Sequence, residues 1–230
     1  MSDDTSPRVK RHRPILPHIR AVVVRLRFTL LMMAGLSVAA WLTDTGFGTV
    51  TARTIDLIGF APRDLWELEA WRALTSAFVT DGAGHFILAL GIVAVVVGIA
   101  EWRTGTPTAV LAFWGAHLAT IVIESLLVAL PLHLSGSLLG TALVAARDVG
   151  PSAGYFGCLG LALASLDLGG PVRLAGFAGT LAVLAAIVLM HVSGSAEETR
   201  ELSAAIAHLI AFPLGVVVWC LHERRRRSSA

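Results

Sequence analysis

The sequence is poor in charge, in aromatic side chains and in cysteine. Of its 230 residues 15% are charged and 55% are hydrophobic, whereas an ordinary soluble domain carries roughly a quarter charged residues. Aromatic residues make up 7%, and the apolar residues are mainly Ala, Leu, Val and Gly, which favours closely packed membrane helices over a β-barrel. Both cysteines, Cys158 and Cys220, lie in apolar segments, so they indicate neither a disulfide framework nor a metal cluster.

Six apolar segments predict an all-α polytopic membrane protein. They cover residues 21–42, 85–100, 109–130, 152–166, 172–190 and 202–221. Several are shorter than the ~20 residues that cross the hydrocarbon core comfortably, so their boundaries are soft. The pattern divides the chain into a disordered basic tail (1–20), a membrane domain (21–222) and a second basic tail (223–230).

The distribution of Lys and Arg predicts the orientation. With six spans both termini share one side, and thirteen of the eighteen basic residues then lie there. The other five are Arg53, Arg63, Arg72, Arg147 and Arg200. By the positive-inside rule, we expect a multi-pass protein of the plasma (inner) membrane with both termini in the cytoplasm. No internal repeat supports a transporter built from two inverted halves.

Polar groups inside apolar segments are expensive in lipid, so they are the first candidates for function. The candidates are His85, His117, Glu124, Ser152 and His208. Structural interpretations exist for the strongest of them. Ser152 follows Gly150-Pro151 as a helix cap would, His85 can open a helix at the interface, and His208 can donate one interhelical hydrogen bond.

Ser152 and His208 together favour chemistry. Ser152 opens a helix directly after a loop, where unpaired backbone N–H groups can stabilise an oxyanion. His208 shares a helix face with Ala211 and Gly215, whose small size lets this helix approach another closely. The two residues can therefore form a nucleophile and base pair, with Phe156, one turn after the serine, against the imidazole ring.

With these residues the chain resembles the rhomboid family of intramembrane serine proteases, from about Trp71 to Gly215. The landmarks occur in the family's order: Trp71-Arg72 in the large first loop, His85 opening the second span, Gly98, Glu101 and Gly105 ending it, Ser152 at the catalytic serine, and Ala207-His208 with Gly215 at the catalytic histidine. The stretches Gly115–Thr120 and Arg147–Gly150 are most similar to a divergent rhomboid-like branch in actinobacteria.

The resemblance implies a six-helix rhomboid-like transmembrane bundle whose Ser152/His208 dyad faces a water-filled cavity open to the outside. The implied reaction is hydrolysis of a peptide bond in or beside a substrate's transmembrane helix, without a cofactor. His85 would support the oxyanion, while Trp71, Arg72 and Glu101 would be structural. The expected partners are membrane lipid and the transmembrane segment of a protein substrate or client, and no nucleic acid is expected.

Three positions depart from the family pattern. Ala153 follows the serine where the family has Gly, and Ala211 stands where a Gly is usual three residues after the histidine. Ala89 replaces the Asn expected one turn after His85, which removes a side-chain oxyanion donor typically worth about 100- to 1000-fold in rate. A catalytically silent protein that binds client transmembrane segments is therefore the alternative to a protease.

Two further interpretations have less support. His117 and Glu124 are seven residues apart on one face of the third span, the one sign of a transporter or proton-coupled protein, and polar contacts inside the bundle explain them as well. A metal site made of His85, His117 and His208 lacks any recognised ligand spacing.

Overall fold

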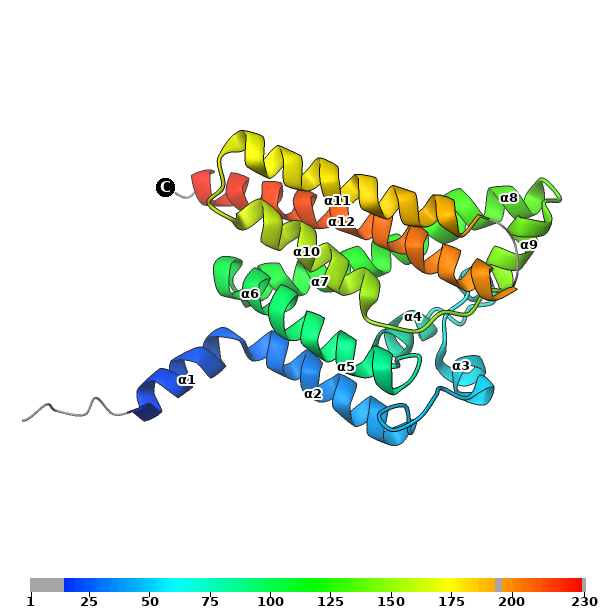
Figure 1. Ribbon diagram of the computed structural model, residues 1–230, viewed down its shortest axis with the longest axis horizontal. Coiled ribbons are helices and arrows are strands. Elements are labelled where there is room, and N and C mark those ends of the chain that lie inside the picture. Colours follow the sequence, from blue (N-terminus) through cyan, green and yellow to red (C-terminus); the bar gives the residue numbers. More distant parts are fainter. Residues whose placement is uncertain (1–14, 193–195, 229–230) are drawn as a thin grey trace, which may run out of the picture.

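The computed structural model describes residues 15–192 and 196–228, and this part is mostly helical, with turns and loops between the helices and one isolated bridge between Phe60 and Asp148 (Figure 1). The helices are α1 (Ile15–Arg25), α2 (Arg27–Leu42), α3 (Ala52–Ile58), α4 (Arg72–Thr75), α5 (Ala83–Ile92), α6 (Gly98–Thr104), α7 (Thr106–Ile123), α8 (Leu130–Leu134), α9 (Leu138–Ala145), α10 (Ser152–Ser165), α11 (Gly170–Met190) and α12 (Ala196–Ser228). The π-helical segments Val93–Val97 and Glu124–Ala129 join α5 to α6 and α7 to α8.

Four helical stretches are long and apolar enough, by length and composition, to cross a membrane. They are Ala83–Thr104, Thr106–Leu134, Gly170–Met190 and Glu198–Ser228. Two shorter apolar helices accompany them, α2 with 16 residues and α10 with 14. The prediction of an all-α chain with several apolar, membrane-type helices is confirmed for the described residues, and each predicted apolar segment overlaps one of these six stretches.

The predicted terminal tails are partly helical. Helix α1 begins at Ile15, within the segment predicted to be disordered, while residues 1–14 lie outside the described part of the chain. The predicted span at 21–42 is divided, because the chain turns at Leu26 between α1 and α2. Pro17 is compatible with α1 because it lies in the first turn, where its missing N–H has no intrahelical partner to lose.

At the other terminus, α12 continues to Ser228, through most of the segment predicted as a basic tail. Arginine is a good helix former, and cations in the last turn interact favourably with the negative end of the helix dipole. The run Arg224–Arg227 therefore extends the helix instead of ending it. The predicted end of the last helix was too early because apolar periodicity gives no signal where a helix continues with polar residues.

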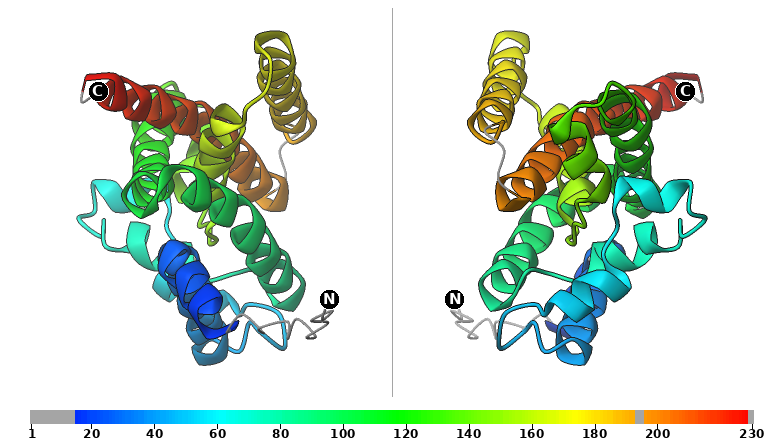
Figure 2. Two further views of the ribbon diagram at one scale, coloured as in Figure 1. Left: turned by 90° about the vertical axis from the view of Figure 1, so that its left-hand side faces the viewer. Right: turned by 90° about the vertical axis from the view of Figure 1, so that its right-hand side faces the viewer.

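Helix α10 lies between α7 and α12 and makes its most extensive contacts with these two (Figures 1 and 2). Glycines permit the close approach. A Cβ atom on Gly157 would meet the side chain of Ala116 on α7, and one on Gly160 would meet the carbonyl oxygen of Phe212 on α12. The helix backbones are therefore in near contact along α10, the kind of packing that small residues allow between membrane helices.

The two ends of the bundle differ. Helix α1 and the C-terminal end of α12 lie at the same end (Figure 1). The opposite end carries α3, α4, α8, α9 and the start of α10. The described part of the long segment 43–84 forms this second end with short helices, and it leaves large apolar side chains exposed: Phe47, Leu57, Trp66, Leu68, Trp71 and Leu74.

Candidate active site

A cavity of about 180 Å³ brings together most of the residues predicted for the catalytic site. Ser152 at the start of α10 and His208 on α12 both line it, and so do His85 and Ala89 on α5. Three helices that are distant in the sequence therefore meet around one space. The cavity lies at the loop-bearing end of the bundle, where α10 begins.

Ser152 is the first residue of α10, and its side chain does not cap the helix. The residue in the capping position is Pro151, and no side-chain hydrogen bond caps the N-terminus. The backbone N–H groups of the first turn, which have no intrahelical acceptors in any helix, therefore also lack a side-chain acceptor here, and they carry the positive end of the helix dipole. The simple explanation of Ser152 as a helix cap does not hold, and its hydroxyl is left free to face the cavity.

The loop before Ser152 is held in place by the long first loop. Gly150 has a φ of 139°, a backbone conformation that favours glycine, and its N–H donates to the carbonyl oxygen of Ser76 at 2.8 Å. The backbones of Phe60 and Asp148 exchange two hydrogen bonds, of 3.0 and 2.8 Å. These contacts fix the direction in which the chain enters α10.

A buried carboxylate reinforces this connection between the loops. The side chain of Asp64 is fully buried, and it accepts hydrogen bonds from the backbone of Ala61 at 2.8 Å and from Arg147 at 2.7 Å. Arg147 also donates to the carbonyl oxygen of Gly59 at 2.9 Å. Burying a charge without partners is costly, so this ion pair is a structural tie between the two loops, and neither residue lines the cavity.

His208 is positioned by Phe156. The two rings are stacked, with centroids 4.2 Å apart and planes inclined by 24°, so the predicted contact one turn after the serine is present. The Nε2 atom of His208 is buried and has no hydrogen-bond partner. Ser152 and His208 line the same cavity without a direct hydrogen bond to each other.

Small residues bring α12 close to α10 behind this pair. Ala153 and Ala211 belong to one buried cluster with Ala116 and Ala207, and Phe156 packs against it. Four residues further along α12, a Cβ atom on Gly215 would overlap the carbonyl oxygen of Gly157. Ala153, Ala211 and Gly215 therefore all lie in the contact between α10 and α12. The methyl groups of Ala153 and Ala211 are accommodated there.

His85 and Ala89 occupy the α5 wall. Nδ1 of His85 lies 3.3 Å from the carbonyl oxygen of Asp81, and the residue is exposed. Ala89 is buried, with 5% of its surface exposed. The i, i+4 spacing places both on one helix face, as predicted. Position 89 offers no polar group to the cavity.

Charged residues that the sequence analysis did not single out surround the cavity. Arg200 on α12 donates to Asp81, just before α5, at 2.5 Å, and both residues line the cavity. Asp148 and Glu201 also line it. Burial raises the pKa of Asp148 to about 6, although the hydrogen bond from the Val149 N–H and the nearby Arg200 act in the opposite direction. The cavity therefore has a charged wall as well as the Ser152 and His208 side chains.

His117 and Glu124 are used inside the bundle. Nε2 of His117 lies 2.7 Å from the carbonyl oxygen of Ala73, and Glu124 accepts a 2.5 Å hydrogen bond from Ser203 on α12. Both residues are buried and line a second, smaller space of about 40 Å³ that also reaches Ser152. Both residues therefore bond to groups of the protein itself, as expected if they make polar contacts inside the bundle.

Arg72 and Glu101 hold backbone groups, as expected of structural residues. Arg72 pairs with Glu69, donates to the carbonyl oxygen of Asp56 at 2.7 Å and lies over the Trp71 ring, 4.9 Å from its centroid. Glu101 is fully buried and accepts hydrogen bonds from the backbone N–H groups of Phe28 and Thr29 at 3.0 and 2.9 Å. It thereby caps the start of α2 from α6.

No group of three His, Cys, Asp or Glu side chains arranged to hold a metal ion occurs within residues 15–192 and 196–228. His85 and His208 share the cavity, whereas His117 lines the smaller space behind Ser152. The three histidines considered for a metal site therefore do not converge on one point of the described structure.

Comparison of the chain with family models, with curated proteins and with solved structures finds no match. Its function is therefore inferred from the cavity and from the residues that line it.

Proposed function

We propose that this chain is an integral membrane serine protease of the rhomboid type, which hydrolyses a peptide bond in or beside a transmembrane helix of its substrate. The observation that carries the proposal is the shared cavity of Ser152 and His208. Ser152 stands at an uncapped helix N-terminus, and His208 is stacked on Phe156 with a buried, unpartnered Nε2. A nucleophile, a base and backbone donors thus face one space.

The six apolar helices support a six-span arrangement in the inner membrane. At about 1.5 Å per residue, α10 and α2 are about 21 and 24 Å long, less than the ~30 Å hydrocarbon core. Ser152, at the start of the short α10, would then lie below the outer surface, with the cavity as its route to water. The described ends of the chain share one end of the bundle, and this end carries Arg20, Arg25, Arg27, Arg103 and Arg224–Arg227, which supports a cytoplasmic location for it.

In the proposed reaction His208 accepts the proton of Ser152 as its Oγ attacks the scissile carbonyl carbon. The developing oxyanion would accept hydrogen bonds from backbone N–H groups at the start of α10. His208 then gives the proton to the departing amine as the C–N bond breaks. Water hydrolyses the acyl-enzyme through the same base, which restores Ser152 and releases the carboxylic acid.

The alternative is a silent protein that uses the same cavity to bind client transmembrane segments. The observation that favours it is Ala89, which lines the cavity at the position where a side-chain oxyanion donor would act. Both functions predict binding of a transmembrane helix near α5 and α12. They differ in whether Ser152 reacts.

Labelling with a fluorophosphonate tests the reactivity of Ser152. The full-length protein in detergent micelles should be labelled, since an activated serine attacks phosphorus as it attacks a carbonyl. Ser152→Ala should abolish labelling and His208→Ala should reduce it about 100-fold or more. The control is Ser137→Ala. It removes another serine at a helix start, but one that does not line the cavity.

Ala89→Asn then separates the two functions. An amide at position 89 can approach the oxyanion, so a protease limited by oxyanion stabilisation should cleave a model transmembrane substrate about tenfold faster or more. Ala89→Val introduces a side chain similar in size to Asn but without a hydrogen-bond donor, so it should not increase the cleavage rate. Adding Ser152→Ala to Ala89→Asn should abolish the gain. If wild type and Ala89→Asn are both folded, unlabelled and inactive, the protease proposal fails and client binding remains.

A further inference from the structure

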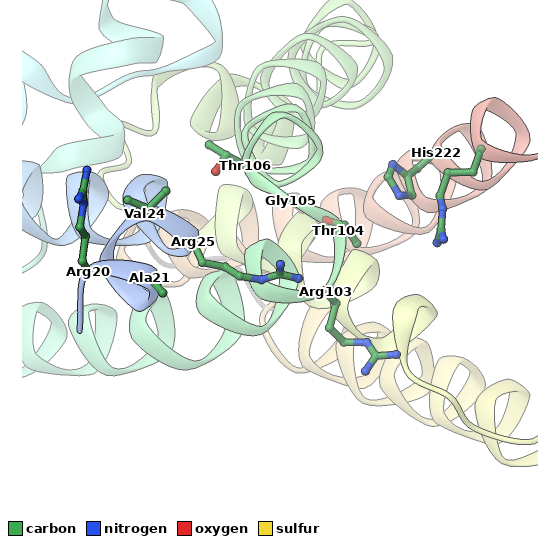
Figure 3. Close-up of a pocket in the computed structure, with 10 residues that line it drawn as sticks. Arg20, Ala21, Val24, Arg25, Arg103, Thr104, Gly105, Thr106 and His222 are labelled. Atoms are coloured by element: carbon green, nitrogen blue, oxygen red, sulfur yellow. The ribbon is translucent and has the colours of Figure 1, made fainter. Parts of the chain in front are cut away.

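A second, larger space lies at the end of the bundle that carries the described termini, opposite the Ser152 cavity. It is an open groove of about 1260 Å³ between α1, the turn from α6 to α7, and the last turns of α12. Figure 3 shows Arg25 at the end of α1 extending toward the end of α6, with Arg20 earlier on α1 at one side and His222 on α12 at the other. The groove is large enough for a whole lipid headgroup with its glycerol.

The lining of the groove is strongly basic. It contains Arg20, Arg25, Arg103 and Arg226 together with His222, and no Asp or Glu is among the lining residues. Two of the arginines have carboxylate partners outside the lining, Asp167 for Arg103 at 2.6 Å and Glu223 for Arg226 at 3.4 Å. Within the described part of the chain, Arg20 and Arg25 have no carboxylate partner, so at least two positive charges in the groove are uncompensated.

Arg25 is fixed in place without being neutralised. Its Nε and one terminal nitrogen donate to the carbonyl oxygen of Trp102, at 3.1 and 2.5 Å, and its guanidinium lies 5.0 Å from the centroid of the Trp102 ring. A carbonyl and an aromatic face orient the cation but leave its full charge. The N-terminus of α7, which begins at Thr106 in the lining without a side-chain cap, adds a partial positive charge.

The other part of the lining is apolar. Ala21 and Val24 face the groove from α1, and 59% of the Val24 surface is exposed. A small inorganic anion would use the arginines and leave this wall empty. A phospholipid would use both, with its phosphate among the arginines and its glycerol and proximal acyl carbons along Val24.

We propose that this groove binds the phosphate headgroup of an anionic membrane phospholipid. The inference requires this end of the bundle to lie at a membrane surface, and it does not depend on proteolysis. Basic pockets between helices at the cytoplasmic side of a membrane protein are suited to anionic headgroups. Lipid bound here ties α1 to α6 and α12.

The test measures binding of phosphatidylglycerol to the full-length protein in neutral detergent, by native mass spectrometry and by the shift in thermal unfolding midpoint. The test variant is Arg20→Gln/Arg226→Gln, because neither side chain hydrogen-bonds to another helix in the described structure. An arginine that contacts the bound headgroup contributes about fivefold to its affinity, so losing two of them should raise the apparent Kd about 10- to 25-fold.

The matched control is Arg224→Gln/Arg227→Gln, which removes the same charge from exposed positions of the same region that do not line the groove. It should change the Kd by less than about twofold. If both variants lost affinity for phosphatidylglycerol equally, the lipid would be held by diffuse electrostatic attraction to this end of the protein, and the proposal would be overturned. Equal binding of phosphatidylcholine, or displacement of the lipid by millimolar inorganic phosphate, would overturn it too. Labelling of Ser152 is measured in parallel and should persist in both variants.

Discussion

Helices α10 and α11 follow each other in the chain, are both apolar and both contain glycine, yet they occupy opposite environments. Nine of the 14 residues of α10 are buried, whereas Leu184 alone is buried among the 21 residues of α11. Figure 2 shows α11 standing at the edge of the bundle, against α12. Hydropathy therefore identifies a membrane-type helix, but it does not tell whether the helix will face protein or lipid.

The glycines explain the difference. Cβ atoms added to Gly157 and Gly160 on α10 would collide with α7 and α12. Only glycine fits at these two positions, because the neighbouring helix backbones are in contact there. On α11, a Cβ atom at Gly179 would have nothing within 4 Å. In lipid, helices associate through close van der Waals packing and not through hydrophobic burial. The helix whose glycines touch neighbouring backbones is consequently central, whereas α11, where a Cβ atom at Gly176 would meet only the Leu163 side chain, remains peripheral.

The largest effect is expected from a substitution that disrupts the contact between α10 and α12. In Gly215→Ala the new methyl would overlap the carbonyl oxygen of Gly157 and lie 2.9 Å from the backbone nitrogen of Leu161. Backbone cannot rotate away as a side chain can, so the helices must separate. The free energy of unfolding should fall by about 3 kcal/mol, measured by denaturant titration in mixed micelles. Fluorophosphonate labelling should fall with it, because separation moves His208 from Ser152. Retained stability would show that α10 is not held by this contact.

An intermediate effect should come from truncating matched leucines on the two helices. Leu161 on α10 is fully buried in the main core cluster, whereas Leu189 on α11 is 76% exposed. Leu161→Ala leaves a cavity that the close-packed helices cannot fill, and it should cost about 1–3 kcal/mol. Leu189→Ala should change the unfolding free energy by less than about 0.5 kcal/mol. Equal losses in the same unfolding assay would mean that α11 has a protein partner on its outer face.

The smallest effect, of opposite sign, is expected at the open glycine. Gly179→Ala adds a methyl group where there is room and replaces a poor helix former by the best one. The unfolding free energy should rise by up to about 1 kcal/mol in the same assay. The contrast with Gly215→Ala isolates steric contact from helix propensity, because the chemical change is identical. A loss at position 179 would contradict the peripheral placement of α11.

Much of the fold and part of the site follow from local sequence signals. Residues 152–166 were predicted as a span, and α10 covers Ser152–Ser165, because Gly150-Pro151 interrupts the preceding segment and an apolar run follows. The neighbourhood of Phe156 and His208 follows from helical spacing together with the small residues of α12. The backbone roles of Arg72 and Glu101 likewise agree with their positions at helix and loop ends.

The charged rim of the cavity could not be predicted from the sequence. Asp81 and Arg200 pair across 119 positions of sequence, and Asp148 enters from a third loop. No periodicity connects such residues, since Asp81 and Asp148 lie in irregular segments whose paths depend on the helices at their ends, and Arg200 meets them only through the packing of α12. The helical extensions at α1 and at Arg224–Arg227 were missed for another reason: apolar patterns do not mark polar helix.

The sequence by itself determined where the apolar helices form, that Ser152 begins one of them, and that an even number of apolar helices brings the chain ends together. These properties depend on neighbouring residues and on local helix geometry. The tertiary structure alone decided that α10 is central and α11 peripheral, that His117 and Glu124 bind Ala73 and Ser203, and that four arginines converge on one groove. Such outcomes depend on how helices rotate and approach each other, and steric fit at a few small residues sets that approach.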